Sequence, residues 1–551
     1  MATEISDEKD ESCHGSDHFE NKPDVDYAHG EEDILYESKG IKSLIRSPYI
    51  LGACVLAACG GLSFGYDQGV ISLILVMDQF RSQYPEVSPE NPHYGFNTGL
   101  MTGMLELGAF LGCLLLPAVA DRYSRKRALA VATVFFCVGA IIQSAAPDYA
   151  TLVAGRAIGG VGVGSMAMGA PLYISEVAPP NLRGSLLVME FISIVIGATL
   201  SYWITYGTRA IESDWAFRLP FVLQMLPALI VGIGLQFFPY SPRWLAMRER
   251  DQDCLLALQK LRRLPETDHR IQAEWNGIIS EVKFQKEMKL REYGVEHSFI
   301  SLEIKEWASL FSQKYFRQTV VALGVNFFQQ FSGICAFVYY APTFILALGQ
   351  SYEMSLILSG MINVCQFVGV IPTFFHLDQM GRRKIAIFGG IAMSIPHFVV
   401  SGIVGRFEDS WSQHKAMGWV CIAFIYLYVL TYAVTYGPLA WALPAEIFPS
   451  HKRAKGVGAA AAMNWLANFI VGVVVPQMLI SLRWGTYLFF GCFCLAASVF
   501  SFFLVPETAG KSLEQVAVSF GANMGMEEEE LRNQIANQVH YQGPLVKDTV
   551  L

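Results

Sequence analysis

Four ionisable residues lie within long apolar segments, where a charge is costly and therefore marks a candidate functional site. They are Asp67, Glu106, Arg156 and Glu190. Asp67 lies about ten residues before the end of the first apolar segment, and Arg156 lies about seven residues after the start of the fourth. In antiparallel helices that rise about 1.5 Å per residue, both would lie about 10–15 Å below the same membrane surface. We therefore expect the two side chains to meet.

A buried carboxyl group beside an arginine can take up and release a proton. The arginine favours the ionised acid and burial favours the neutral acid, so a group balanced between them takes a proton when the arginine moves away. We interpret Asp67 and Arg156 as a proton-coupling pair, with a permanent structural ion pair as the alternative. Glu106 and Glu190 lie nearer the middle of their segments and could line a cavity, pair with another helix or stay protonated.

The elements that must position these residues are apolar segments long enough to cross a bilayer as helices. The 551-residue chain is 53% hydrophobic and only 16% charged, whereas a soluble protein carries about 25% charged residues. We predict an all-α membrane protein with about twelve transmembrane helices. Their expected ranges are 49–77, 97–120, 127–146, 149–178, 185–208, 218–239, 317–347, 354–377, 384–405, 418–444, 454–482 and 485–505.

Charged residues at the ends of these segments recur in the same order in the two halves of the chain. An aspartate and an arginine lie between two apolar segments, and the same pair returns about 260 residues later. Each pair is followed by a glutamate and an arginine at the same spacing. Such repeats indicate an internally duplicated membrane protein, which is how many secondary transporters are built. The repeated residues are Asp121, Arg125, Glu176 and Arg183, then Asp378, Arg382, Glu446 and Arg453.

A charged segment joins the two halves. Basic residues gather on its side of the membrane, so the positive-inside rule and an even number of helices put it and both termini in the cytoplasm. Ser241-Pro242 opens the segment with an N-cap and a proline at the first helical position, which favours short amphipathic helices over a solvated linker. The polar tails, including Glu527–Glu530, are expected to be disordered. The expected domains are an N-terminal tail 1–47, a six-helix bundle 48–239, a cytoplasmic helical linker 240–316, a six-helix bundle 317–505 and a C-terminal tail 506–551.

The sequence gives no sign of metal, nucleotide or nucleic-acid binding or of enzymatic catalysis. The eleven cysteines form no CxxC pair and no metal-ligand spacing, so we expect neither a metal nor a cofactor. The glycines between Gly155 and Gly164 are similar to a nucleotide-binding loop, but they lie within an apolar segment, where small residues let helices approach closely. We see no nucleophile–base pair that would indicate an enzyme. The net charge of −8 arises largely in the tails and is no sign of a nucleic-acid partner.

In combination, several motifs resemble the sugar porter family of the major facilitator superfamily over about residues 48–515. The resemblance implies the major facilitator fold, with two six-helix bundles and alternating access around one central hexose or pentose site. It also implies that the repeated charges form a cytoplasmic network, which holds the outward-facing state closed on the inside and must break on each cycle. The motifs are Phe64-Gly65-Tyr66-Asp67, Gly155-Arg156-Ala157-Ile158-Gly159-Gly160, Pro171-Leu172-Tyr173-Ile174-Ser175-Glu176, Gln329-Gln330-Phe331-Ser332-Gly333, Asp378-Gln379-Met380-Gly381-Arg382, Pro444-Ala445-Glu446 and Pro506-Glu507-Thr508.

The same resemblance assigns sugar contacts mainly to the C-terminal half, where amides would bond to hydroxyls and aromatic rings would cover C–H surface. Interhelical hydrogen bonds are the alternative role for Gln329 and Gln330, and packing at a broken helix is the alternative role for Trp441. The chain departs from the family at four positions: Phe191 and Ala198 replace glutamines, Cys335 replaces an asparagine, and Tyr240 replaces a glutamate. Each lost partner in the cavity would discriminate against a sugar hydroxyl by roughly 1–3 kcal/mol. The candidate substrate-binding residues are Phe64, Glu190, Phe191, Gln329, Gln330, Cys335, Tyr339, Asn363, Gly437, Trp441 and Asn464.

We therefore expect a monosaccharide transporter of the plasma membrane, driven by the proton gradient and acting as a monomer in the bilayer. Asp67 would take the proton, with Arg156 as its partner. One alternative is a facilitative sugar or polyol uniporter, since some facilitators of the family keep both residues. Another is a sugar sensor that transports little, which the lost cavity amides and the cytoplasmic tails favour.

Overall fold

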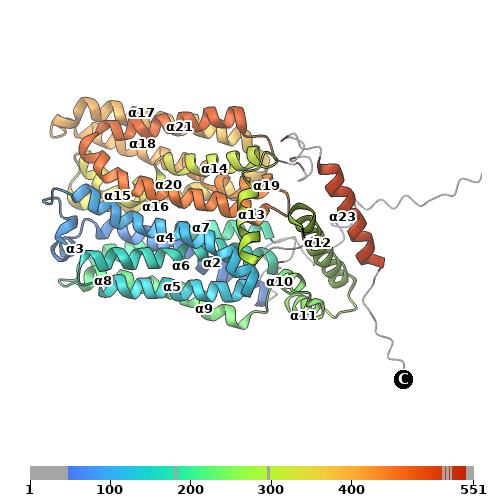
Figure 1. The fold of residues 1–551 in the computed structure, drawn as a ribbon. Coiled ribbons are helices and arrows are strands. Elements are labelled where there is room, and N and C mark those ends of the chain that lie inside the picture. Colours follow the sequence, from blue (N-terminus) through green and yellow to red (C-terminus); the bar gives the residue numbers. More distant parts are fainter. Residues whose placement is uncertain are drawn as a thin grey trace, which may run out of the picture.

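The computed structural model describes residues 48–178, 183–294, 298–509, 511, 516, 520 and 524–541. Within these residues every regular element is a helix, which confirms the all-α prediction. The expected N-terminal tail, 1–47, lies outside the described residues. Figure 1 shows two layers of long, roughly parallel helices, the earlier part of the chain in blue and cyan and the later part in yellow and orange.

The first layer, the N-terminal bundle, begins with one long helix and a short loop region. Its elements are α2 (Pro48–Ile74), α3 (Asp78–Gln83), η2 (Pro85–Val87), α4 (Tyr94–Tyr123), α5 (Arg125–Ala145), α6 (Tyr149–Val177), α7 (Arg183–Thr208), α8 (Trp215–Leu223), α9 (Met225–Gly234) and η4 (Leu235–Phe237).

The second layer is the C-terminal bundle. Its elements are α14 (Phe316–Phe331), α15 (Ile334–Ala347), α16 (Tyr352–Met380), α17 (Arg382–Phe407), η5 (Glu408–Ser410), α18 (Lys415–Val434), α19 (Tyr436–Ile447), α20 (Arg453–Ser481) and α21 (Trp484–Leu504). Between the bundles in sequence come α10 (Pro242–Met247), α11 (Asp251–Arg262), α12 (His269–Tyr293) and α13 (Phe299–Ser309), and α23 (Met524–Tyr541) follows the second bundle.

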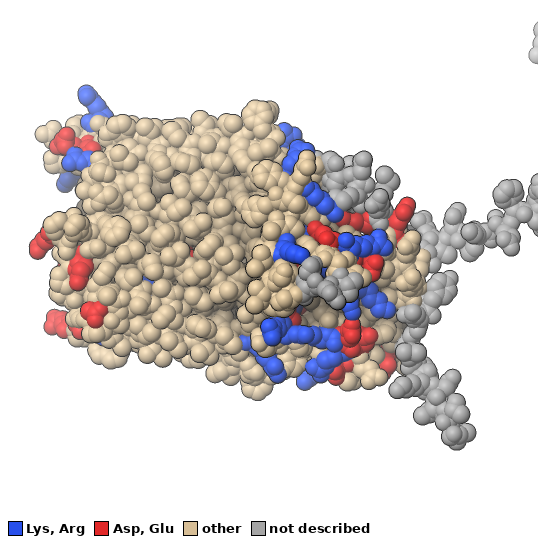
Figure 2. Space-filling view, viewed as in Figure 1, with Lys and Arg blue, Asp and Glu red and all other residues tan. Residues whose placement is uncertain are grey.

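The membrane-spanning character of the bundles is evident from length and composition. Eleven helical stretches of the described chain are long and apolar enough to cross a membrane. The 27-residue α2 precedes them and is not among the eleven. Large apolar side chains such as Val134, Phe388 and Phe503 are 60–75% exposed on the outer faces. Figure 2 shows a wide band almost free of charge between two charged ends, with Lys and Arg gathered at the end that carries α10–α13. We call this end the linker end and the opposite one the far end.

Glycines set the closest helix contacts within the N-terminal bundle. On α2, Gly61, Gly65 and Gly69 face the backbone of α7 at Glu190, Ile194 and Ala198, so closely that a Cβ at these glycines would collide with it. The rows of small residues thus let helix backbones touch, as expected for membrane helices. The glycines of α6 act in the same way, because Gly160 and Gly164 face the backbone of α4 at Leu105 and Ala109.

Three expected spans are each divided into two helices, and one of the resulting helices, α15, is also kinked. Two of the three breaks lie beside candidate site residues. Gly333, at φ +98°, separates α14 from α15, and this left-handed conformation favours glycine. Thr435, at φ −113° and ψ −88°, separates α18 from α19. Within α15, Tyr340 departs from helical geometry two residues before Pro342, which cannot donate a backbone hydrogen bond. The third interruption is the turn at Gln224 between α8 and α9.

The segment between the bundles forms helices that pack together, as the sequence indicated. Ser241 caps α10 by accepting a hydrogen bond from the Trp244 backbone N–H, with Pro242 at the first helical position. Helix α13 runs across the linker end and contacts both bundles (Figure 1). Its Phe299 ring lies 5.2 Å from the Arg122 guanidinium of α4, and its Glu303 binds Lys455 of α20.

The C-terminal tail differs from the prediction. The segment around Glu527–Glu530 was expected to be disordered, but it belongs to α23. This helix buries Leu531, Ile535 and Val539 against the apolar face of α12, which explains why a segment rich in acids folds. The spacing of these apolar residues, four apart, indicates an amphipathic helix, but the prediction relied on the high content of charged residues instead.

Candidate proton and substrate site

Asp67 and Arg156 meet in the interior of the N-terminal bundle, as expected. Asp67 on α2 is fully buried and Arg156 on α6 is 1% exposed. Their nearest charged atoms, Arg156 Nη1 and Asp67 Oδ1, are 3.9 Å apart. Arg156 bonds more closely to α4, because its Nε donates to the Met101 carbonyl at 2.8 Å and its Nη2 to the Thr102 carbonyl at 3.4 Å. The ion pair is therefore at the limit of contact.

Several polar atoms of this pair are buried without a hydrogen-bond partner among the described residues. They are both carboxyl oxygens of Asp67 and Nη1 of Arg156. A buried charged group that lacks partners is costly, and proton uptake by the carboxyl group relieves that cost. The ion pair is thus long and incompletely hydrogen-bonded, whereas a permanent structural ion pair is expected to show short, fully satisfied bonds.

Tyr339, a candidate sugar contact, joins the two bundles next to this pair. Its hydroxyl donates a hydrogen bond of 2.5 Å to Glu106 Oε1 on α4. The hydroxyl also accepts hydrogen bonds from Gln68 Nε2 at 3.2 Å and from Asn468 Nδ2 at 3.0 Å. Glu106 therefore pairs with another helix, one of the three roles that the sequence left open.

The candidate amides of the C-terminal half form one network. Gln329 Nε2 donates to the carbonyls of Tyr436 and Gly437, both at 3.1 Å, where the break between α18 and α19 turns these groups toward α14. Asn464 of α20 lies between the two glutamines: its Nδ2 donates to Gln329 Oε1, and its Oδ1 accepts from Gln330 Nε2 at 2.9 Å. The amides thus satisfy one another, and a sugar would exchange its hydroxyls for these bonds.

Cys335, which stands where the family has an asparagine, takes part in the same network. Its Sγ donates to Gln330 Oε1 at 2.7 Å. A thiol can donate only one weak hydrogen bond, whereas an asparagine amide offers two donors and an acceptor. The substitution therefore keeps Gln330 in place and removes hydrogen-bonding capacity toward a ligand.

The aromatic candidates lie between the bundles. Phe191 of α7 packs against Val370 and Ala433 of the C-terminal bundle, and a Cβ at Gly437 would lie 3.4 Å from its ring. An apolar ring that packs between the bundles thus occupies the position where the family has an amide. Phe64 lies 4.8 Å from the ring of Trp465. Trp441 is partly buried against the same apolar cluster as Phe64 and Trp465.

Two further candidates are buried polar groups. Glu190 is 6% exposed beside Gly61 of α2 and makes no hydrogen bond or ion pair with the residues that the structure describes. Asn363 of α16 is 3% exposed, and its Oδ1 has no partner in the described chain. Both side chains keep acceptor capacity for a ligand.

The repeated charges of the N-terminal half form a cluster at the linker end. Arg125 binds Asp121 at 2.7 Å and Glu176 at 3.1 Å. Glu176 also accepts a 2.5 Å hydrogen bond from Ser241, which caps the first linker helix. The side chain of Arg183 lies outside the described residues.

The C-terminal half repeats this arrangement. Arg382 Nη2 lies 2.8 Å from Glu446 Oε1, and Glu446 Oε2 accepts a 2.5 Å hydrogen bond from Thr508. Glu507 Oε1 accepts from the Arg382 backbone N–H at 2.7 Å. Thr508 thus corresponds to Ser241 of the first half. The side chain of Asp378 lies outside the described residues, and Arg453 is partly exposed at the start of α20.

The departure at Tyr240 has a local explanation. In the second half Glu507 caps α17, but in the first half the Ser124 hydroxyl caps α5 by accepting from the Arg127 backbone N–H. Tyr240 instead places its ring 5.4 Å from the Lys126 ammonium group. A glutamate is therefore not needed at this position for the cap.

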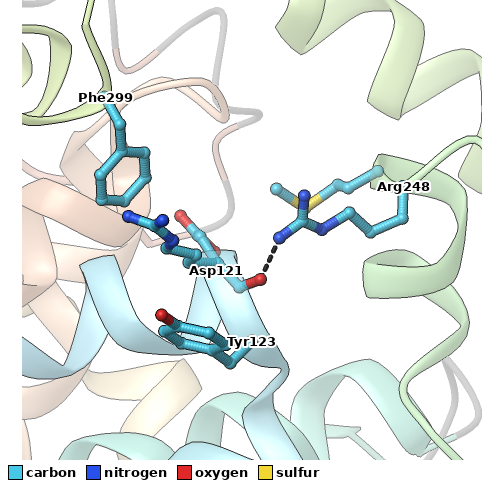
Figure 3. A pocket seen from close by; sticks show the side chains of 6 residues that line it. Asp121, Tyr123, Arg248 and Phe299 are labelled. Carbon is cyan, nitrogen blue, oxygen red and sulfur yellow. Dashed lines mark hydrogen bonds between the residues drawn. The ribbon is translucent and has the colours of Figure 1, made fainter.

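A pocket of about 560 Å³ opens at the linker end beside the first charge cluster. Figure 3 shows Arg248 reaching across it toward α4, where it donates to the Arg122 carbonyl. Asp121, Tyr123, Met247 and Phe299 complete the lining. The pocket lies where linker helices α10 and α13 meet α4, so the linker covers the charges of the N-terminal half.

Comparison with known proteins places the chain in a family. The family model described as "Sugar (and other) transporter" matches residues 53–520. The chain belongs to this family, the sugar porters of the major facilitator superfamily. A "High-affinity glucose transporter" of Kluyveromyces lactis is 32% identical over 503 residues, which are 88% of this chain and 87% of the relative. "H(+)/hexose cotransporter 2" of Parachlorella kessleri is 30% identical over 489 residues, with 86% of each chain covered.

Solved structures agree with this assignment. The proton:xylose symporter XylE bound to 6-bromo-6-deoxy-D-glucose matches with a TM-score of 0.68 and 27% identity, covering 86% of this chain and 99% of the other. A partially occluded, inward-open XylE from E. coli matches equally well, at a TM-score of 0.68, 26% identity and coverage of 85% and 100%. The predicted major facilitator fold is thereby confirmed.

Sequence reasoning missed several residues that the structure brings into the site. Asn326 and Trp465 belong to the amide and aromatic groups, and Gln68 and Asn468 bind Tyr339. Spacing offered a signal for two of them. Asn326 precedes Gln329 and Gln330 by about one turn on α14, and Asn468 follows Asn464 by one turn on α20, so each shares a helix face with predicted residues.

Proposed function

We propose that the chain carries a monosaccharide, a hexose or a pentose, across the plasma membrane together with protons, by alternating access between its two bundles. The observation that carries the proposal is the buried, loosely bound Asp67–Arg156 pair, which lies next to a polar network of the C-terminal half. The relatives named as a proton–hexose cotransporter and a proton:xylose symporter support it. The proton gradient supplies the driving force, and no cofactor or enzymatic step is part of the proposal.

We propose further that the linker end faces the cytoplasm, since the basic side chains gather there (Figure 2). Both termini would then be cytoplasmic. At the far end, bonds join the bundles directly: the Tyr352 hydroxyl donates to the Val76 carbonyl at 2.9 Å, and Arg209 binds Glu353 at 2.6 Å. In this orientation the structure corresponds to a state closed toward the outside, and a single chain is the working unit.

The two charge clusters at the linker end serve as gates in this scheme. Arg125–Glu176 and Arg382–Glu446 join the ends of helices within each bundle and bind the segments that leave it. Because such pairs hold one arrangement and must rearrange for the other, their role is to make the transporter bistable. Asp121, Arg183, Asp378 and Arg453 complete the proposed network.

Uptake by cells that lack their own sugar transporters tests the function. Labelled glucose, xylose and a polyol are supplied with and without a protonophore. We expect accumulation of a monosaccharide above its outside concentration, and collapse of that accumulation to equality when the protonophore is added. Uptake that equilibrates and ignores the protonophore would indicate a uniporter. Sugar binding without uptake by correctly localised protein would favour a sensor.

A further inference from the structure

The hydrogen bond between Tyr339 and Glu106 crosses the boundary between the two bundles. Glu106 is 1% exposed on α4, and its Oε1 accepts from Tyr339 of α15 at 2.5 Å. A phenol hydroxyl has one donor and two acceptor sites. Tyr339 uses all three, on Glu106 and Gln68 of the N-terminal bundle and on Asn468 of α20. The charge of Glu106 is thus in direct contact with the C-terminal bundle.

Glu106 also belongs to the electrostatic surroundings of the Asp67–Arg156 pair. It follows Thr102, whose carbonyl accepts from Arg156 Nη2 at 3.4 Å, by one helical turn on α4, and its own Oε2 has no hydrogen-bond partner among the described residues. Arg156 donates from two of its nitrogens to α4 carbonyls, and only its Nη1 has no hydrogen-bond partner among the described residues. One guanidinium charge must therefore balance the carboxyl groups of both Asp67 and Glu106. Two ionised carboxylates with one cation would leave a buried net negative charge, which is costly. Charge balance therefore requires a proton on one of the two acids.

We propose that Glu106 is a second proton-carrying residue and that its bond to Tyr339 conveys its charge to the C-terminal bundle. The inference rests on the proposed function, which supplies the proton gradient. When Glu106 is ionised, Tyr339 donates a charge-assisted hydrogen bond, which is about twice as strong as a neutral one. A proton arriving from solution at Oε2 changes the group from −1 to 0 and weakens this bond. The neighbouring kink at Tyr340 gives α15 a place to bend once Tyr339 is released.

Asp67 and Glu106 compete for Arg156 in this scheme. When the charge of Glu106 is removed, Arg156 stabilises only the ionised form of Asp67. A lower pH is then needed to protonate Asp67 and drive uptake. The variant Tyr339→Phe acts in the same direction, because Glu106 loses the donor that stabilises its ionised form. Other titratable or charged groups that face Glu106 are Cys335 and Tyr340, and all variants retain them.

The test measures uptake of labelled D-glucose and D-xylose by the full-length protein in proteoliposomes at outside pH values from about 4.5 to 8. For E106Q we expect the pH midpoint of uptake to move about one unit or more toward acid. Y339F should shift it in the same direction, and E106Q/Y339F should shift it no further than E106Q alone. The exposed Glu90 provides the matched control, and E90Q should keep the wild-type midpoint.

A wild-type midpoint in E106Q would overturn the proposal, since a merely structural role would change protein amount or stability but not the pH profile. If E106Q cannot be purified in folded form, Y339F decides the question, because it keeps the packed ring. Uptake by the wild type that ignores a protonophore would instead reject proton symport. In that case tryptophan fluorescence titrations with D-glucose in detergent still test Glu106: equal pH dependence of sugar affinity in wild type and E106Q would reject its role.

Discussion

Arg156 holds its Nη1 atom 3.9 Å from Asp67 Oδ1 while its Nε donates at 2.8 Å to the Met101 carbonyl. The arginine is thus anchored to α4 rather than to the acid that it neutralises. Any movement of α2 relative to α4 and α6 changes the distance between Arg156 and Asp67 and hence the tendency of Asp67 to hold a proton. This relationship gives a physical link between helix movement and proton binding.

Replacing Asp67 by Asn should abolish accumulation but leave exchange. Asparagine keeps the size and polarity of the side chain and cannot carry a proton, so the gradient loses its connection to the sugar. The measurement is labelled-sugar uptake against a gradient, together with counterflow in sugar-loaded vesicles. We expect the inside-to-outside ratio to fall to about one while counterflow continues. Full accumulation by the variant would show that Asp67 is not the coupling residue.

Replacing Gln330 by Ala should weaken sugar binding. The variant removes both the bond to Asn464 and the acceptor of the Cys335 thiol, and unpaired buried groups cost about 1–3 kcal/mol each. We expect KM to rise about tenfold or more, measured from initial uptake rates. Gln236 is exposed near the linker end, and its side chain donates to the Gly232 carbonyl of the same helical segment, so Q236A should keep the wild-type KM.

Replacing Glu446 by Gln should slow transport with little change in KM. Hydrogen bonds to a charged group contribute about 1.5–3 kcal/mol, so losing the charge that binds Arg382 should reduce the saturated rate about ten- to hundredfold. The exchange R382E/E446R should restore part of the rate. The ion pair between the exposed Arg483 and the partly buried Glu408 is the control, because R483A removes a surface ion pair worth at most about 1 kcal/mol. Equal losses in E446Q and R483A would contradict the gate.

The docking of α23 should weaken in acid because of His451. Burial, together with Lys452, Lys314, Lys289 and Arg532, lowers the pKa of His451 to about 3. The unfolded chain, with a histidine pKa of about 6.5, then binds more protons than the folded one between about pH 3 and 6.5. Stability should therefore fall as the pH drops through this range, by up to about 1.4 kcal/mol per unit. Burial raises the pKa of Glu528, which lies 3.9 Å from His451, and this carboxyl group works in the opposite direction.

Thermal unfolding midpoints in detergent between about pH 4.5 and 7.5 check this expectation. The variant H451Q keeps a hydrogen-bonding group next to the Tyr315 hydroxyl and should flatten the pH dependence. The exposed His269 supplies the control, and H269Q should retain the wild-type curve. An unchanged curve in H451Q would rule His451 out as its source.

The sequence predicted the long helices well, because an apolar run of the required length has few alternatives in a bilayer. It also brought Asp67 and Arg156 together, since helix rise alone determines their depth. It could not place Glu106, whose partner Tyr339 lies 233 residues away and depends on how the bundles pack. Interhelical hydrogen bonds were an open alternative for the two glutamines, but the choice of Asn464 as the partner of Gln330 depends on packing in the same way. Both results come from tertiary packing rather than from local pattern.

The glycine row of α2 has a mechanical consequence. Since Gly61, Gly65 and Gly69 put the backbone of α2 directly against that of α7, no flexible side chains separate the two helices at these points. If one helix rolled or slid past the other, their backbones would clash, so α2 and α7 should move together as one rigid unit. Asp67 on α2 and Glu190 on α7 both belong to this unit. Displacement of the proton site would then displace the neighbouring wall of the sugar pathway by the same amount.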